Sequence, residues 1–101
     1  MKSKINLEKM CSSADQACEL MKVMANRDRL LILCELSQGE RCVGELEEIL
    51  EIHQPTLSQQ LTVLRNKELV TTRREGKQIY YSLSHQIAMS VMLLLYKHYC
   101  E

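Results

Sequence analysis

The residues best suited to chemistry in this sequence are five cysteines, Cys11, Cys18, Cys34, Cys42 and Cys100. Cys11 and Cys18 are seven positions apart in one expected helix, a separation of roughly 10 Å that excludes a disulfide between them and fits core packing as well as chemistry. Cys42 is expected near a helix N-terminus, where a thiol becomes more reactive, or it is simply a small buried residue. Cys34 lies in an apolar run that favours a core position, whereas Cys100, one residue from the end, has little packing value.

The cellular compartment limits what these thiols can do. The first ten residues, MKSKINLEKM, lack the apolar run of a signal peptide, and no stretch approaches the length of about 18 apolar residues that a membrane span needs. We therefore expect a cytoplasmic protein with no membrane partner, in which thiols stay reduced. The cysteines then serve as core residues, metal ligands or sensors.

A second chemical feature is a helix face that is polar but uncharged. Leu57, Leu61 and Leu64 recur at helical spacing and define the buried side of a helix that is expected to begin at Pro55. At about 100° per residue, Gln59 points almost directly away from that side. Glutamine can bond adenine through two hydrogen bonds in the major groove, and Ser or Thr can bond either base-pair partner. The face predicts contact with base edges, with a plain solvated helix as the alternative.

Charge is segregated along the chain although 13 basic and 13 acidic residues cancel. Residues 35–51 carry six acidic side chains and one basic side chain, whereas residues 65–77 carry five basic side chains and two acidic ones. Formal neutrality argues against a polycation that coats nucleic acid or anionic lipid. The basic segment can still bind phosphate if its side chains form the surface that faces the nucleic acid. The alternative is an ordinary solvated hairpin.

The basic segment also has the pattern of a β-hairpin. Residues 70–74 and 78–83 alternate in polarity on either side of a short turn that contains Gly76, and the tip carries Arg73, Arg74 and Lys77. The helix that begins at Pro55 follows a short helix over about residues 43–51 after a tight turn, and two short helices joined in this way form a helix-turn-helix. A helix-turn-helix that is followed directly by a basic hairpin predicts a winged helix. In such a fold the helix reads the DNA sequence and the wing holds phosphates.

The remaining elements must position these two features. Apolar periodicity predicts helices over residues 6–25, 27–36 and 84–101, and a short third helix whose buried side carries Val43, Leu46, Ile49 and Leu50. The chain has 101 residues, 46 % of them apolar, with three glycines and one proline. We therefore predict one mainly α-helical domain over residues 1–101, with five helices and a small hairpin.

The last helix is apolar on all sides, which indicates that it is buried on all sides. One small domain cannot cover such a helix, so we expect a homodimer in which the first and last helices pack against their copies. Two-fold symmetry would place two polar helices on half-sites about one DNA turn apart. The predicted partner is therefore a pseudo-palindromic double-stranded DNA operator.

Three segments of the chain resemble the ArsR/SmtB family of bacterial dimeric winged-helix repressors: MANRDRL at 24–30, QPTLSQQLTVLRNKELV at 54–70 and TTRREGKQIYYSL at 71–83. The resemblance implies a DNA-binding repressor of the same fold. The groove contacts that it implies are Gln54, Ser58 and Gln59, with Thr56 and Gln60 close by. The wing contacts that it implies are Arg73, Arg74 and Lys77. Pro55 departs from the family, whose members often have serine there.

The metal-sensing members of that family imply two sites, and both are incomplete in this chain. The first uses two cysteines with one residue between them, whereas this chain has Cys42-Val43-Gly44. The second lies on the last helix and is formed across the dimer, and the matching positions are His85, Ile87, His98 and Glu101. Ile87 cannot bind a metal, and a soft metal needs several convergent ligands. We expect no metal and no cofactor, and a metal-sensing repressor stays the alternative function.

The phrases LLILCEL and LYKHYC, around Cys34 and Cys100, resemble the BigR, SqrR and HlyU subgroup of the family. The resemblance implies that these two cysteines are a redox-sensing pair for persulfides or other reactive sulfur species, and that a di- or polysulfide link between them releases the operator. A redox enzyme and a protein-interaction module are the alternatives from other classes. We expect no enzyme, because the chain has no C-x-x-C, no nucleophile beside a base and no phosphate loop.

Overall fold

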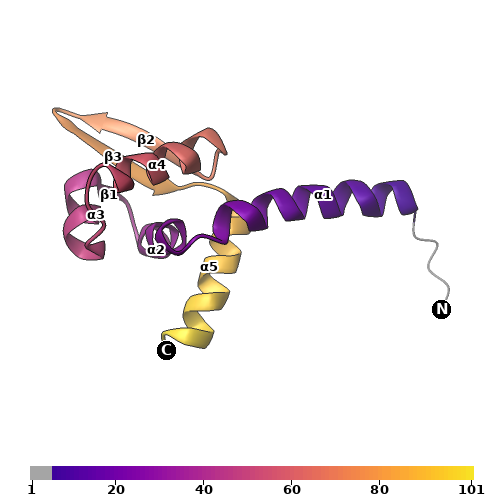
Figure 1. Ribbon diagram of the computed structural model, residues 1–101. Helices are drawn as coiled ribbons and strands as arrows, with labels where there is room; N and C mark the ends of the chain where they lie inside the picture. The colour runs from indigo at the N-terminus through magenta and orange to yellow at the C-terminus, as the bar shows by residue number, and fades with distance from the viewer. Residues whose placement is uncertain (1–5) are drawn as a thin grey trace.

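The computed structural model describes residues 6–101, which form five helices and a three-stranded sheet (Figure 1). In chain order the elements are α1 (Leu7–Met24), α2 (Arg27–Leu36), β1 (Arg41–Cys42), α3 (Val43–Leu50), α4 (Thr56–Asn66), β2 (Val70–Glu75), β3 (Gln78–Leu83) and α5 (Gln86–Tyr99). The predicted mainly helical fold with a small hairpin is confirmed. No helix within residues 6–101 combines the length and the apolar character needed to cross a membrane.

Two helices begin at side chains that satisfy backbone donors. Asn26 accepts a hydrogen bond from the Arg29 N–H at 3.0 Å at the start of α2. His85 accepts one through Nδ1 from the Ala88 N–H at 3.2 Å at the start of α5. The first turn of a helix has N–H groups without partners inside the helix, so these contacts stabilise both starting points.

The helix that carries the polar face, α4, begins one residue later than predicted. Pro55 is its N-cap residue and Thr56 is its first helical residue, so the expectation that Pro55 opens the helix is wrong by one position. The predicted buried side is confirmed, because Leu57, Leu61 and Leu64 are all fully buried. This side holds α4 against α2 and β2.

The strands β2 and β3 form the predicted hairpin, and β1 adds a third strand that was not predicted. The sheet is antiparallel with the order β1-β3-β2, and Arg41 and Cys42 of β1 pair with Tyr81 and Tyr80. A two-residue strand is too short to show alternation in the sequence. In the turn of the hairpin, Gly76 has a φ of +64°, a conformation that glycine adopts without steric cost.

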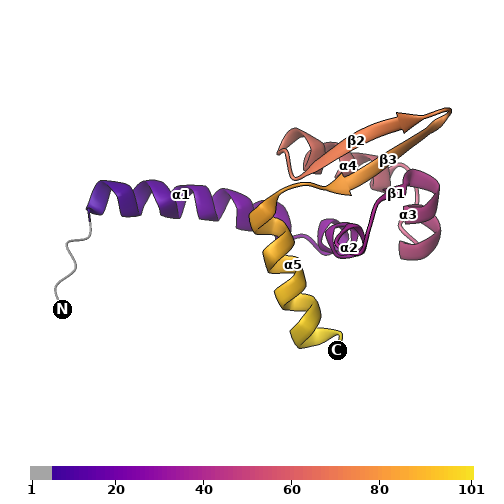
Figure 2. The ribbon, with the colours of Figure 1, turned by 180° about the vertical axis from the view of Figure 1, so that it is seen from behind.

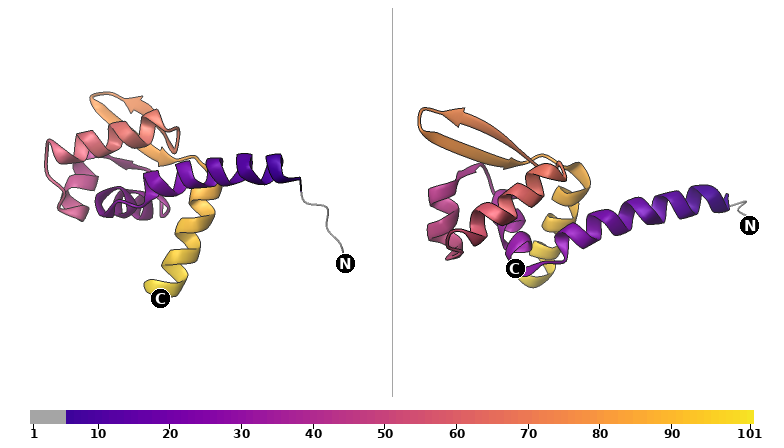
Figure 3. Two further views of the ribbon diagram at one scale, coloured as in Figure 1. Left: turned by 45° about the vertical axis from the view of Figure 1, so that its right-hand side comes forward. Right: turned by 45° about the horizontal axis from the view of Figure 1, so that its top comes forward.

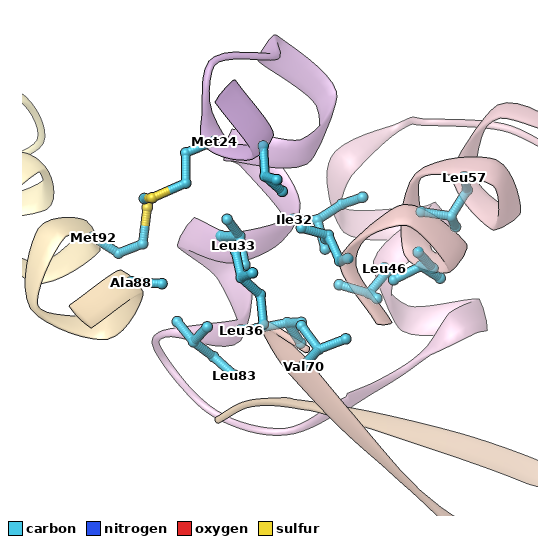
Figure 4. Packing of buried hydrophobic residues seen from close by; sticks show 14 of the residues in the cluster. Met24, Ile32, Leu33, Leu36, Leu46, Leu57, Val70, Leu83, Ala88 and Met92 are labelled. Atoms are coloured by element: carbon cyan, nitrogen blue, oxygen red, sulfur yellow. The ribbon is translucent and has the colours of Figure 1, made fainter. Parts of the chain in front are cut away.

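The core is built around α2, which contacts α1, α3, α4, α5 and β3. Figure 4 shows Leu33 of α2 pointing toward Ala88 and Met92 of α5, whereas Ile32 points toward Leu46 of α3. All five residues are buried. The helix α2 therefore lies between α5 on one side and the α3–α4 pair on the other.

The helices α1 and α5 carry apolar side chains that this chain leaves uncovered. Only Val23 and Met24, at the end of α1, are buried, and the rest of α1 extends away from the other elements (Figures 1 and 3). In α5 only Ala88 and Met92 are buried, which agrees with the expectation that one small chain cannot cover this helix, and its burial on all sides stays a prediction for the dimer. The exposed large apolar residues of the two helices are Leu7, Met10, Met21, Ile87, Leu93, Leu94 and Tyr99.

We expect Leu33→Ala to lower the free energy of unfolding by about 3 to 5 kcal/mol, because Leu33 is fully buried and its truncation leaves a cavity in the centre of the core. Ile49→Ala is the matched control. Ile49 was predicted on the buried side of the third helix, but it is 50 % exposed because α3 packs on α2 and the sheet mainly through Leu46. Urea unfolding at one fixed protein concentration measures both variants. Equal losses of stability would contradict the central place of α2.

Candidate nucleic-acid interface and thiol pocket

The predicted groove residues of α4 divide into two groups. Ser58 and Gln59 are exposed, whereas Thr56 and Gln60 are half-buried. Gln59 lies opposite the buried leucine stripe of the helix, and Ser58 lies at its side. The surface that α4 offers to a partner is therefore centred on Ser58 and Gln59, with Thr56 and Gln60 at its border with the protein.

Gln54, just before α4, is paired with Ser58. Its Oε1 accepts hydrogen bonds from the Ser58 N–H at 3.1 Å and from the Ser58 hydroxyl at 2.7 Å. Gln54 thereby satisfies a free donor in the first turn of α4, where the cap residue Pro55 has no polar side chain. Both side chains are exposed, and the Gln54 amide nitrogen is not used in this contact.

Gln60 turns toward α2 and bonds Arg29, a contact that the sequence did not predict. The Gln60 Oε1 accepts a hydrogen bond from Arg29 Nη1 at 2.8 Å. The same guanidinium donates from Nε to the Val23 carbonyl at 2.6 Å and from Nη2 to the Lys22 carbonyl at 3.4 Å. One side chain of α2 thus joins the end of α1 to α4. No local pattern reveals a contact between residues so far apart in the chain.

The hairpin is fixed by Arg73, whose guanidinium is already paired within the chain. It donates from Nε and Nη2 to the two carboxylate oxygens of Glu40, each at 2.9 Å, and from Nη1 to Glu75. The guanidinium also lies over the ring of Tyr80, 4.7 Å from its centroid. The hydrogen bond from Arg73 lowers the pKa of Glu40 and that bond in turn raises the pKa of Arg73, so both groups stay charged at neutral pH. Glu40 is a further residue that the sequence analysis missed.

Arg74 and Lys77 are the predicted wing cations with charge available to a phosphate. Within residues 6–101 neither forms an ion pair, and Arg74 donates from Nε to the Gly76 carbonyl at 3.1 Å. Both side chains are exposed near the turn of the hairpin. Figures 1 and 2 show the hairpin and α4 on the same side of the molecule, away from the C-terminal end of α5.

Cys34 and Cys100 line one pocket between α2 and α5. The cavity has a volume of about 320 Å³, and its other walls are mainly apolar and aromatic. Its remaining lining residues are Arg27, Leu30, Leu31, Met92, Leu95, Tyr96 and Tyr99. We call this cavity the thiol pocket. The structure thus brings together the two cysteines that were predicted as a pair, with Cys34 half-buried and Cys100 exposed, both as free thiols.

The two thiols differ in their surroundings. Burial raises the pKa of the Cys34 thiol, and the negative charges of ionised Cys100 and Glu35 raise it further. Because the thiolate is the nucleophile, only a small fraction of Cys34 is reactive at neutral pH.

We expect iodoacetamide to modify Cys100 before Cys34 near neutral pH, because Cys100 is exposed and Cys34 is half-buried with a raised pKa. The rate at Cys34 should keep rising with pH beyond about 8.5, the ordinary thiol pKa. Timed labelling followed by peptide mass spectrometry measures both rates, with the exposed Cys11 as the reference thiol. Equal rates at Cys34 and Cys11 at every pH would contradict the assignment.

The other cysteines occupy different environments. Cys42 is buried at the start of α3, and its N–H donates to Glu45 Oε1 at 2.9 Å, which lowers the pKa of Glu45. Burial favours the packing interpretation of Cys42 over a reactive one. Cys11 and Cys18 are both exposed on α1, so packing inside their own chain does not account for them.

The possible metal ligands do not gather within one chain. Among residues 6–101, no group of three or more His, Cys, Asp and Glu side chains lies close enough to hold a metal ion. His85 caps the start of α5, whereas His98 and Glu101 lie at its other end, roughly 20 Å away at 1.5 Å per residue. The geometry of a single chain therefore gives no support to the metal-sensing alternative.

Comparison with known proteins agrees with this architecture. The model of the family described as "Bacterial regulatory protein, arsR family" matches residues 26–72. The chain is 48 % identical over 96 residues to the "Biofilm growth-associated repressor" of Agrobacterium fabrum, covering 95 % of this chain and 82 % of that protein.

Two solved structures share the whole fold. Reduced HlyU from Vibrio cholerae superposes with a TM-score of 0.90 at 41 % identity, covering 93 % of this chain and 99 % of that one. The transcriptional repressor BigR from Xylella fastidiosa superposes with a TM-score of 0.86 at 42 % identity, covering 96 % and 99 %. With these similarities and its winged-helix arrangement of α3, α4 and the β2–β3 hairpin, the chain belongs to the arsR family of bacterial transcriptional regulators.

Proposed function

We propose that this protein is a homodimeric repressor that binds a pseudo-palindromic DNA operator while Cys34 and Cys100 are free thiols and releases it when they are linked. The effector is a reactive sulfur species such as a persulfide. The observation that carries the proposal is the meeting of Cys34 and Cys100 at one pocket, although they lie far apart in the chain.

The DNA-binding part rests on α4 and the hairpin. Gln59 and Ser58 offer exposed polar groups for base edges, Gln54 is exposed beside them, and Arg74 and Lys77 offer charge for phosphates. Arg73 would act on the DNA mainly through the position of the wing, because Glu40 and Glu75 occupy its donors. Thr56 and Gln60 border this surface and face it only in part.

The dimer rests on the uncovered apolar faces of α1 and α5. Soluble proteins rarely expose large contiguous apolar patches unless another surface covers them. The exposed side chains include Leu93 and Leu94, which are 50 % and 56 % exposed. A second copy of the chain, packed through these two helices, buries them and presents two copies of α4 to one duplex.

The thiol chemistry follows from the difference between the two cysteines. The exposed Cys100, as a thiolate, takes the outer sulfur of an organic persulfide and releases the organic thiolate. The Cys34 thiolate then attacks the inner sulfur of this persulfide, which is Cys100 Sγ itself. The bond from Sγ to the outer sulfur breaks, the Cys34–Cys100 disulfide forms, and the outer sulfur leaves as hydrosulfide. The two protein thiols are oxidised and the transferred sulfur is reduced, so electrons and atoms balance. Bridges that retain further sulfur atoms would be longer.

The bridge would act on DNA binding through α2. Cys34 lies on α2, which contacts α4, and Cys100 immediately follows α5. A covalent link therefore ties the support of the recognition helix to the helix that the dimer uses. If this link favours a different angle between the two copies of α4, operator affinity falls.

Random-site selection with the reduced protein, followed by measurement of operator affinity before and after treatment with glutathione persulfide, tests the proposal. We expect a two-fold symmetric site and a large loss of affinity that dithiothreitol reverses. No sequence preference would favour a protein-interaction module. A tightly bound zinc or cadmium ion that releases DNA from the reduced protein would favour the metal-sensing repressor.

We expect the wing cations to differ in their effect on salt dependence. Each phosphate contact contributes about 0.9 to the slope of log affinity against log salt concentration, so Lys77→Gln should lower the slope of the dimer by about 2 if both wings bind. Arg73→Gln should change the slope less, because its charge is already balanced by Glu40 and Glu75. Operator titrations at several salt concentrations measure this. If Arg73→Gln changed the slope more than Lys77→Gln, Arg73 and not Lys77 would be the main phosphate contact of the wing.

A further inference from the structure

The helix α2 separates the thiol pocket from α4. Its residues Arg27, Leu30, Leu31 and Cys34 line the pocket and share one side of the helix. The Arg29 side chain projects from the opposite side of α2, because it lies two positions after Arg27 and each position turns the helix by roughly 100°. Figure 4 shows the same division in the core, where α2 lies between α5 and the α3–α4 pair.

On that opposite side, Arg29 makes a directional contact with α4. Its bond to Gln60, at 2.8 Å, is the one hydrogen bond between side chains of α2 and α4 in the part of the chain that the structure describes. The other contacts of the two helices are apolar side chains such as Ile32, Leu57 and Leu61. Apolar contacts tolerate small displacements, whereas a hydrogen bond weakens steeply as its angle changes.

Arg29 is also tied to α1. Its Nε and Nη2 donate to the carbonyls of Val23 and Lys22, in the last turn of the helix that the proposed dimer uses. The backbone N–H of Arg29 is held by Asn26. The guanidinium is planar, so its donors move together when α2 moves. A shift of α2 relative to α1 must therefore change the position of the Arg29–Gln60 contact.

We propose that Arg29 is the positioning residue that couples the thiol pocket to α4, acting through Gln60. This inference rests on the proposed function. Linking Cys34 to Cys100 draws α2 against α5. The Arg29 guanidinium moves with α2, so the displacement reaches Gln60 through their hydrogen bond and then the neighbouring Gln59 on α4. In the reduced protein the same contact holds α4 at the angle that fits the operator.

The test compares wild type with Arg29→Lys, Gln60→Leu and Arg29→Lys/Gln60→Leu. For each protein the operator affinity is measured with reduced thiols and after bridging with glutathione persulfide. The quantity compared is the ratio of the reduced affinity to the bridged affinity. Normalising to the reduced form removes any direct effect of Gln60 on DNA. Intact mass confirms the bridge, and thermal unfolding confirms that each variant is folded.

We expect each single variant to lower the ratio by about 2- to 30-fold, a range typical of residues that carry coupling between sites. The double variant should show no further loss, because both substitutions remove the same contact. Gln60→Glu keeps an acceptor for Arg29 and should retain most of the ratio. A merely structural role would change the affinity of both forms equally and leave the ratio unchanged.

Arg41→Lys is the matched control. Arg41 donates to Glu35 of α2 at 3.0 Å and, among the described residues, forms no hydrogen bond with α4, so its loss should leave the ratio as in wild type. An equal fall for Arg41→Lys would mean that general loosening of α2 explains the effect, and would overturn the inference. An undiminished ratio in the Arg29 and Gln60 variants would overturn it alone, whereas a wild-type ratio of one removes the proposed function as well.

Discussion

Cys34→Ser and Cys100→Ser should each bind the operator as the reduced wild type does and keep that affinity after treatment with glutathione persulfide. The wild type should lose about 5- to 150-fold under the same treatment, the range that a coupling of about 1 to 3 kcal/mol produces. Serine keeps the size of the side chain and removes the sulfur. Cys34 is only half-buried in the thiol pocket and Cys100 is exposed, so neither substitution leaves a cavity that threatens the fold.

The two variants should differ in the product that remains. Cys34→Ser retains the exposed thiol, so a persulfide formed on Cys100 has no second thiol in the pocket to attack it and should persist. In the thiol pocket, Cys100→Ser retains only Cys34, the thiol whose pKa burial raises, so the pocket should react slowly. Peptide mass spectrometry after short exposure, which separates Cys34 and Cys100 from the exposed Cys11 and Cys18, distinguishes the two outcomes.

Cys11→Ser is the control for this experiment, because Cys11 is exposed on α1 and lies outside the thiol pocket. It should respond as wild type does. If Cys34→Ser loses operator binding as much as wild type, the pair is not the sensor, and the exposed thiols of α1 become the next candidates.

The parts of the fold that the sequence predicted are those with a local period. Leu57, Leu61 and Leu64 fix the buried side of α4 because every turn repeats the signal, and the alternation of β2 and β3 fixes the hairpin. The strand β1 has two residues and no period, so it could not be found. The apolar character of α5, in a chain too small to cover it, predicted that its own chain leaves much of it exposed, and the structure has only Ala88 and Met92 of this helix buried.

The site was predicted less completely, because its polar contacts join distant positions. Arg73 was expected to hold phosphate, yet the structure pairs it with Glu40, which lies directly before β1. Gln60 was expected beside the groove, yet it bonds Arg29. In both cases the residue type indicated a polar contact, but the sequence could not identify the partner. A hydrogen bond between residues far apart in the chain leaves no periodic pattern in the sequence. The meeting of Cys34 and Cys100 came from family resemblance alone.

The helix α4 should lose sequence discrimination when Gln59 is shortened. We expect Gln59→Ala to weaken operator binding by about 5- to 150-fold per contacted base pair, because a bidentate contact to a base edge contributes about 1 to 3 kcal/mol of discrimination. Binding to unrelated DNA should stay almost unchanged, since phosphate contacts supply it. Gln59 is exposed, so its truncation should have little effect on folding.

Two other variants separate base readout from phosphate binding and from general surface effects. Lys77→Gln should weaken binding to operator and unrelated DNA alike, because phosphate contacts carry no sequence information. Gln38→Ala removes another exposed glutamine, in the turn after α2, and should change neither affinity. Competition titrations with operator and scrambled duplexes at one salt concentration measure all three proteins. If Gln59→Ala reduced both affinities equally, α4 would contact the backbone only, and base readout would have to come from another part of the chain.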